Sequence, residues 1–191
     1  MIDLTPSADQ FIEKGSLLLA EPFISDPFFK RTVILVCDHG KEGSFGFVLN
    51  NYVEVELSQL IEDFPDDKIN VSIGGPVKSS NLFYLHTQGE AIPNSVAIMD
   101  GLYFGGDFDV LKQKVLSGEI ALKEIRFFLG YSGWGVGQLD DELGEKSWFV
   151  TKVNAATIMH YNEKDMWRGI MRKLGKKGQL VANFPEDPEL N

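Results

Sequence analysis

The stretch that decides the fold of this chain is Phe127 to Leu143, FFLGYSGWGVGQLDDEL. It joins an apolar run to an acidic, amphipathic run through four glycines, Gly130, Gly133, Gly135 and Gly137. Glycine loses more conformational entropy on folding than any other residue and offers no side chain for packing, so such a segment is typical of a place where bare main chain is needed. We therefore expect a strand followed by a tight strand-to-helix turn that approaches another element closely.

The rest of the chain predicts an α+β fold. Short β-branched or apolar runs between turn residues predict strands over 15–20, 32–37, 45–49, 69–73, 82–86, 95–99, 102–104, 124–129 and 147–153. Asp26 and Pro27 predict the start of one helix, as a cap and a first helical residue. Helical spacing and capping residues predict further helices over 57–64, 107–118, 139–143, 154–159 and 167–174. Strands dominate the first two-thirds, and helices collect at the end.

These elements suggest one compact domain over residues 1–182, with a mixed or antiparallel sheet, or a partial barrel, flanked by helices. The segment 183–191 is acidic and proline-rich, and we expect it to be a loosely ordered tail. Pro65 and Gly175 are expected to end the helices that precede them.

Composition excludes several classes of protein. The formal net charge is −10, which repels nucleic-acid phosphates, so direct DNA binding is not expected. The single cysteine, Cys37, excludes a disulfide within the chain and a zinc site built on several thiolates. The first residues have neither a basic nor a long apolar region, and no apolar run approaches the roughly 20 residues that span a bilayer. We expect a soluble, cytoplasmic protein with no membrane contact, metal or cofactor.

The glycine segment matches neither of two catalytic or nucleotide-binding patterns. A nucleophile elbow centred on Ser132 requires glycine at position 134, where the chain has Trp134. A dinucleotide fingerprint that starts at Gly133 requires glycine at position 138, where the chain has Gln138. Acids at 140–142 would repel a phosphate at the start of the following helix. Packing therefore explains the glycines better than a phosphate or nucleophile site does.

Other candidate site residues lie at strand ends. Strand alternation places Cys37 and His39 on one face and Asp38 on the other. The pair is a thiolate activated by a nearby imidazole, half of a metal site, or a small apolar residue beside a polar strand end, and the last interpretation is favoured because nothing nearby in sequence completes a site. His86 is a candidate second imidazole. A turn that glycine alone adopts easily explains Gly74-Gly75, and the alternative interpretation is that main chain exposed at this strand end lines a pocket.

The last predicted helix and its exit carry a cluster of basic side chains. Four of them are candidate contacts for an anionic ligand or RNA: Arg172, Lys173, Lys176 and Lys177. Basic residues near a helix C-terminus also complement the helix dipole, and a solvated helix face is the alternative interpretation.

Three blocks of this sequence together resemble the YqgE/AlgH family of bacterial proteins. They are residues 15–50, GSLLLAEPFISDPFFKRTVILVCDHGKEGSFGFVLN; residues 73–77, IGGPV, with FYLH at 83–86; and residues 128–150, FLGYSGWGVGQLDDELGEKSWFV, with Trp167-Arg168. The pair Asn50-Asn51 departs from the family pattern, which usually continues through a basic residue and a proline. The resemblance implies a compact α+β fold and carries over no catalytic residue. The family is largely uncharacterised, and some members are labelled transcriptional regulators.

Two functional hypotheses follow. The first is a non-enzymatic regulatory or binding module with a protein or small-molecule partner, in which Tyr131 and Trp134 supply contact surface and Gln138 a hydrogen bond. The alternative is a hydrolytic or thiol-dependent enzyme that uses Cys37 or Ser132 as nucleophile, with His39 or His86 as base.

Overall fold

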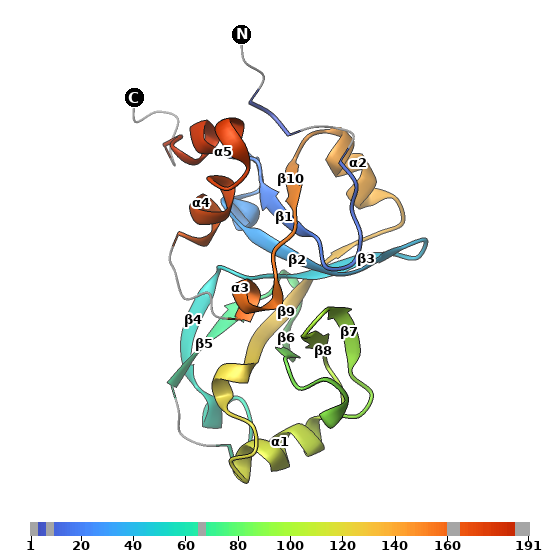
Figure 1. Cartoon of the computed structure of the whole chain (residues 1–191), viewed down its shortest axis with the longest axis vertical. Helices are drawn as coiled ribbons and strands as arrows, with labels where there is room; N and C mark the ends of the chain where they lie inside the picture. The colour runs from blue at the N-terminus through green and yellow to red at the C-terminus, as the bar shows by residue number, and fades with distance from the viewer. Residues whose placement is uncertain (1–3, 7–9, 65–67, 160–164, 186–191) are drawn as a thin grey trace.

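Strand β9 (Ile125–Trp134) lies at the centre of the fold and pairs along both of its edges (Figure 1). One edge contacts β3 (Gly43–Val48), which is antiparallel, and β5 (Lys68–Ile73), which is parallel. The other edge contacts β6 (Val77–His86), which is antiparallel. The computed structural model describes residues 4–6, 10–64, 68–159 and 165–185.

The described strands form one ten-stranded, largely antiparallel open sheet in the order β10-β1-β2-β3-β9-β6-β8-β7, with β4 attached through β5. The remaining strands are β1 (Leu17–Ala20), β2 (Val33–Gly40), β4 (Tyr52–Glu56), β7 (Val96–Met99), β8 (Leu102–Phe104) and β10 (Trp148–Thr151). Together with the helices described below, this sheet confirms the predicted α+β class.

Within the described residues the α-helices are α1 (Phe108–Leu116), α2 (Gln138–Gly144), α3 (Ala155–Met159), α4 (Met166–Met171) and α5 (Gly175–Ala182). Asp107 caps α1, because its side chain accepts hydrogen bonds from Asp109 N and Val110 N. Short 3₁₀ turns cover Pro27–Phe29, Leu57–Gln59, Gly89–Ala91 and Leu122–Glu124. Figure 1 shows α2, α4 and α5 around β1 and β10, and α1 at the opposite end of the molecule.

Both faces of the sheet carry a hydrophobic core. Leu17 and Leu35 pack with Trp167 of α4 on one face, while Leu18 and Ile34 pack with Trp148 on the other. A strand that is buried on both faces has a continuous apolar sequence, as residues 33–37 do. A third cluster surrounds α1, through Leu111 and Val115.

The chain crosses β9 at its glycines. Residues 74–76 lead from β5 on one edge of β9 to β6 on the other. A Cβ atom on Gly75 would lie 2.1 Å from the carbonyl carbon of Tyr131, and one on Gly74 would lie 2.4 Å from the Gly130 oxygen. Gly130 itself has φ +67°, and its Cβ would lie 2.6 Å from the Gly75 oxygen. The expected close approach of main chains is confirmed at this crossing.

Several sequence predictions were wrong in detail. The segment 130–134 is not a strand-to-helix turn, because β9 continues through Trp134 and the turn covers only 135–137. The predicted helix over 57–64 is limited to a 3₁₀ turn, and it follows strand β4, which was not predicted. Gly175 does not end the last helix but begins α5. The predicted tail lies outside the described residues from position 186 onward.

Candidate functional site

An aromatic groove of about 570 Å³ lies over β3, β6, β8 and β9. Its rings come from strands that are distant in sequence, and Phe47, which is fully buried, is the deepest of them. We call this site the aromatic groove, and its lining is Asp38, Glu42, Gly43, Ser44, Phe45, Phe47, Val77, Phe83, Phe104, Tyr131, Gly133 and Trp134.

The rings of the groove pack against one another edge to face or at a tilt. Tyr131 lies 6.2 Å from Phe45 and 5.7 Å from Phe83, with interplanar angles of 83° and 85°. Phe104 lies 5.5 Å from Phe45 and 5.6 Å from Phe47. Aromatic pairs at these distances and angles are favourable beyond the area that they bury, by about 0.5–1.5 kcal/mol each. The lining is therefore a mutually packed set of rings.

Two carboxylates lie at the rim of the groove, and a β-bulge places one of them there. The β2–β3 register shifts between Val36 and Asp38, so that Asp38 pairs with Phe45 and His39 with Ser44. Cys37 packs in the same cluster as Phe45, and Asp38 lines the groove. The predicted alternation was wrong, because the bulge places Cys37 and Asp38 toward one face and His39 toward the other.

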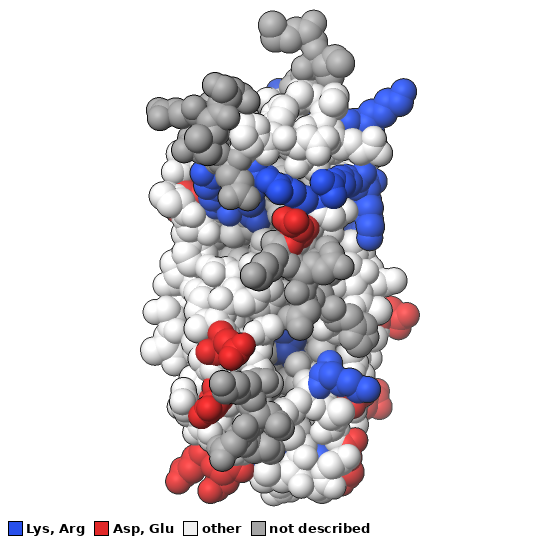
Figure 2. Space-filling model, turned by 90° about the vertical axis from the view of Figure 1, so that its left-hand side faces the viewer, with Lys and Arg blue, Asp and Glu red and all other residues white. Residues whose placement is uncertain are grey.

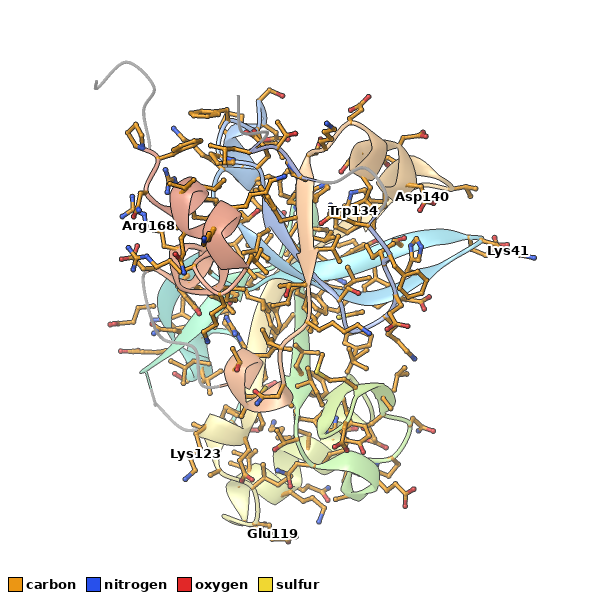
Figure 3. The ribbon with its side chains drawn as sticks, turned by 45° about the horizontal axis from the view of Figure 1, so that its top comes forward. Lys41, Glu119, Lys123, Trp134, Asp140 and Arg168 are labelled. Carbon is orange, nitrogen blue, oxygen red and sulfur yellow. The ribbon has the colours of Figure 1, made fainter. Side chains whose placement is uncertain are left out.

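Neither rim carboxylate is neutralised by a neighbour. Asp38 and Glu42 are exposed, and among the described residues no Lys or Arg nitrogen lies within 4.0 Å of either. Lys41 lies between them in sequence but projects from the tip of the β2–β3 hairpin (Figure 3). The rim of the groove therefore carries two exposed carboxylates without an ion-pair partner among the described residues.

Trp134 and Gln138 take part in a hydrogen-bond network beneath α2. The indole nitrogens of Trp134 and Trp148 both donate to Oε2 of Glu142, at 3.0 and 2.8 Å. Gln138 accepts from Gly135 N at 3.0 Å and donates to Glu142 Oε1 at 3.1 Å. Trp134 is 7% exposed, and its ring packs with Trp148 and Leu139 in the cluster on the other face of the sheet from Phe45 and Tyr131, while the Gln138 amide is occupied by local contacts.

The two candidate nucleophiles lie in the core, each with a local partner. Ser132 is buried on β9 and donates to the Gly74 oxygen at 3.2 Å. Cys37 is buried, and its Sγ donates to the Leu35 oxygen at 3.8 Å. Burial raises the pKa of the Cys37 thiol far above its usual range, and the charge of Asp38 adds to this increase. A neutral, buried thiol is a poor nucleophile.

We expect the Cys37 thiol to be inert in the folded protein. Native protein mixed with the thiol reagent DTNB should release no thionitrobenzoate over minutes, and denatured protein should release one equivalent, because only the thiolate attacks the reagent. A rapid native reaction would show that the thiol is accessible and ionised. That result would restore the thiol-dependent enzyme as an alternative.

The candidate imidazoles have separate surroundings. His86 is buried; its Nε2 lies 2.9 Å from the Gly105 oxygen and 3.0 Å from Ser95 Oγ, and its Nδ1 accepts from Gln88 N at 3.2 Å. Burial lowers the pKa of His86, which favours the neutral ring. His39 contacts Ser44 Oγ at 2.8 Å, and its Nε2 lies 3.9 Å from Asp140. Neither ring has a hydrogen bond to Cys37 or Ser132.

The four basic candidates lie on one face, formed by α4, α5 and their connection. Figure 2 shows a band of blue side chains across this face, with red side chains gathered nearer the other end of the molecule. In the described part of the chain, no carboxylate lies within 4.0 Å of Arg172, Lys173, Lys176 or Lys177. The groove and the basic face are separate sites.

Sequence reasoning missed most of the groove. It identified Tyr131 and Trp134 but not the phenylalanines or the rim carboxylates. Phe45 and Phe47 alternate on β3, and this pattern does predict a shared face. No local sequence pattern indicates that Phe83 and Phe104 join the same groove.

The described residues contain no group of three His, Cys, Asp or Glu side chains that could hold a metal. None of the described helices is long and apolar enough to span a membrane.

The fold and the groove together define a small α+β protein with an open sheet and an aromatic groove. The chain belongs to the YqgE/AlgH family, because the AlgH-like family model matches residues 17–179. It is 40% identical to a UPF0301 protein of Cytophaga hutchinsonii, over 94% of this chain and 100% of that protein. It is 41% identical to a UPF0301 protein of Bacteroides thetaiotaomicron, over 93% of this chain and 91% of that protein.

Solved structures have the same fold. The solution structure of the AlgH protein from Pseudomonas aeruginosa has a TM-score of 0.70 and 27% identity, over 90% of this chain and 94% of that chain. The crystal structure of protein DIP2367 from Corynebacterium diphtheriae has a TM-score of 0.74 and 24% identity, over 92% of this chain and 94% of that chain. The second likeness concerns the fold alone.

Proposed function

We propose that this protein is a cytoplasmic, non-enzymatic binding module whose aromatic groove receives an apolar group of its partner. The observation that carries the proposal is the groove itself, in which Phe45, Phe83, Phe104 and Tyr131 stay partly exposed around the buried Phe47. Its volume lies within the range of about 300–1,000 Å³ that is usual for ligand sites. Any regulatory role would act through this contact.

The surroundings of Cys37 and Ser132 favour binding over catalysis. A nucleophile needs a base within hydrogen-bond reach, and these two side chains instead donate to main-chain oxygens of Leu35 and Gly74. Neither residue is part of the groove lining. The groove has the surface that desolvates an apolar group, and its rim supplies carboxylates rather than an arranged acid, base and nucleophile.

The test is binding of N-phenyl-1-naphthylamine, a neutral aromatic probe that fluoresces when it leaves water. Phe104→Ala should weaken probe binding at least about tenfold, which corresponds to about 1.4 kcal/mol, because a wall of the groove is removed. Phe108→Ala is the matched control, since Phe108 is also a partly buried phenylalanine but packs on Tyr84 in another cluster. Titration of both variants and the unaltered protein gives the comparison.

Folding is monitored by thermal unfolding of each variant before titration. Equal weakening by Phe104→Ala and Phe108→Ala would indicate a general loss of packing and contradict the proposal. Absence of probe binding by the unaltered, folded protein would contradict it directly.

A further inference from the structure

The rim of the groove points to the chemistry of its partner. We infer that the aromatic groove binds an arginine side chain presented by a basic segment of a partner protein. The inference rests on the proposed function, because it assigns an occupant to the same groove. It is carried by the position of two exposed carboxylates, Asp38 and Glu42, directly beside aromatic rings.

The lining disfavours ligands of other chemistry. The phenylalanine rings have no polar atoms, so the ring set contributes a single hydroxyl, that of Tyr131; the Ser44 hydroxyl already contacts His39, and the carboxylates at the rim repel anions. A polar metabolite would lose hydrogen bonds to water on entering and regain few of them. A neutral apolar group would fill the groove but would gain nothing from Asp38 and Glu42.

An arginine side chain fits each part of the site. Its aliphatic stem can pack against Phe45 and Tyr131, and its planar guanidinium can stack on a ring face. The same guanidinium carries a fork of N–H donors that suits a carboxylate such as Asp38. Lysine has a similar stem, but its ammonium is a compact, strongly hydrated charge that neither stacks nor forms a bidentate pair.

Charge over the whole molecule supports a basic partner. The chain carries a formal net charge of −10, which attracts a cationic segment at long range. The main concentration of basic side chains, on α4 and α5, lies away from the groove; Figure 3 shows Arg168 on the opposite side of the molecule from Lys41. The basic side chains of α4 and α5 therefore do not pair with Asp38 and Glu42.

The experiment is an NMR titration of the ¹⁵N-labelled protein with the peptide acetyl-Gly-Ser-Arg-Ser-Gly-amide. The matched probes carry citrulline, which keeps the shape of arginine without its charge, or lysine at the central position. We expect shifts at the amides of Gly43, Ser44 and Gly133, which line the groove. The arginine peptide should bind at least about fivefold more tightly than either matched probe, because only it combines stacking with a charge-assisted pair.

The double substitution Asp38→Asn with Glu42→Gln should remove this preference and leave the arginine and citrulline peptides equal. The control is Glu62→Gln with Glu90→Gln, which makes the same change in net charge at exposed acids outside the groove. The control protein should keep the full preference. A preference lost equally in both proteins would reflect net charge alone and would overturn the inference.

The naphthylamine probe separates this inference from the proposed function. Equal binding of arginine and citrulline peptides, with probe binding that still depends on Phe104, would overturn the arginine occupant and leave the binding module in place. Equal or tighter binding of the lysine peptide would likewise overturn it. Failure of both the peptides and the neutral probe would contradict the two proposals together.

Discussion

Replacing Arg126 by methionine should destabilise the protein by about 3–5 kcal/mol, a large part of the total stability of a domain of this size. Arg126 lies on β9 and is only 6% exposed. Its Nη1 donates to the Ile158 oxygen at 2.5 Å, and its Nη2 donates to the Leu49 oxygen. Removal of the guanidinium leaves these buried acceptors without a donor, at about 1–3 kcal/mol each.

The guanidinium joins β9 to the paired strands β4 and β5. Besides its main-chain contacts, it donates to Tyr52 Oη of β4 at 2.8 Å and to Ser72 Oγ of β5 at 3.2 Å. It also lies over the rings of Tyr52 and Phe128, at 5.4 and 5.5 Å from their centres. Burial lowers the pKa of Arg126, and the hydrogen bond to Tyr52 opposes that shift. The charge is tolerated because neutral acceptors and ring faces surround it.

The measurement is urea unfolding followed by circular dichroism. Arg126→Met should lower the urea concentration at the unfolding midpoint and leave the slope of the unfolding free energy against urea unchanged. The midpoint of Arg126→Lys should lie between those of the unaltered protein and Arg126→Met, because one ammonium reaches fewer acceptors than the guanidinium does. Arg172→Met is the control, since Arg172 is exposed and has no carboxylate within 4.0 Å among the described residues; it should change stability by less than about 0.5 kcal/mol. A loss below about 1 kcal/mol for Arg126→Met would contradict the stabilising role of the Arg126 hydrogen bonds.

Local sequence signals predicted the strands well and the groove poorly. Residues 33–37 are uniformly apolar because β2 is buried on both faces, and Asp107 is a typical N-cap. The strand and the start of the helix could therefore be predicted without knowing which elements pack against them. The spacing of Leu57, Ile61 and Phe64 resembled a helix. In the structure these side chains only fill one cluster from a 3₁₀ turn and the irregular chain after it. The periodicity therefore reflected burial and not helical backbone.

The site depends on long-range pairing that no local pattern encodes. Asp38 faces the groove only because β2 bulges against β3, and a bulge depends on the register of both strands. Phe83 reaches Tyr131 because β6 leaves register with β9 between Val77 and Leu82. The placement of Phe83 is linked to the crossing of β9 by residues 74–76. The sequence predicted that the glycines of β9 approach another element closely, but it did not identify that element.

That crossing leads to the second large effect. Gly130→Ala should cost roughly 3 kcal/mol or more and should also weaken naphthylamine binding. Gly130 has φ +67°, where an alanine is strained by about 1–2 kcal/mol. Its new Cβ would lie 2.6 Å from the Gly75 oxygen and 2.9 Å from the Val77 oxygen, a main-chain overlap that adds about 1–3 kcal/mol. Relief of the overlap must shift the chain over 75–77 or β9 around Gly130, and these segments carry Val77 and Tyr131 of the groove lining.

The variant Gly118→Ala separates the free-energy cost of backbone strain from that of steric overlap. Gly118 has φ +79°, but its Cβ would meet nothing within 4 Å, so this variant carries the backbone strain alone and should lose only about 1–2 kcal/mol with unchanged probe binding. Urea unfolding and probe titration of both variants give the comparison. Equal losses at the two positions would show that the crossing tolerates a side chain. That result would contradict the prediction that the close approach of residues 74–75 to β9 holds Tyr131 at the groove.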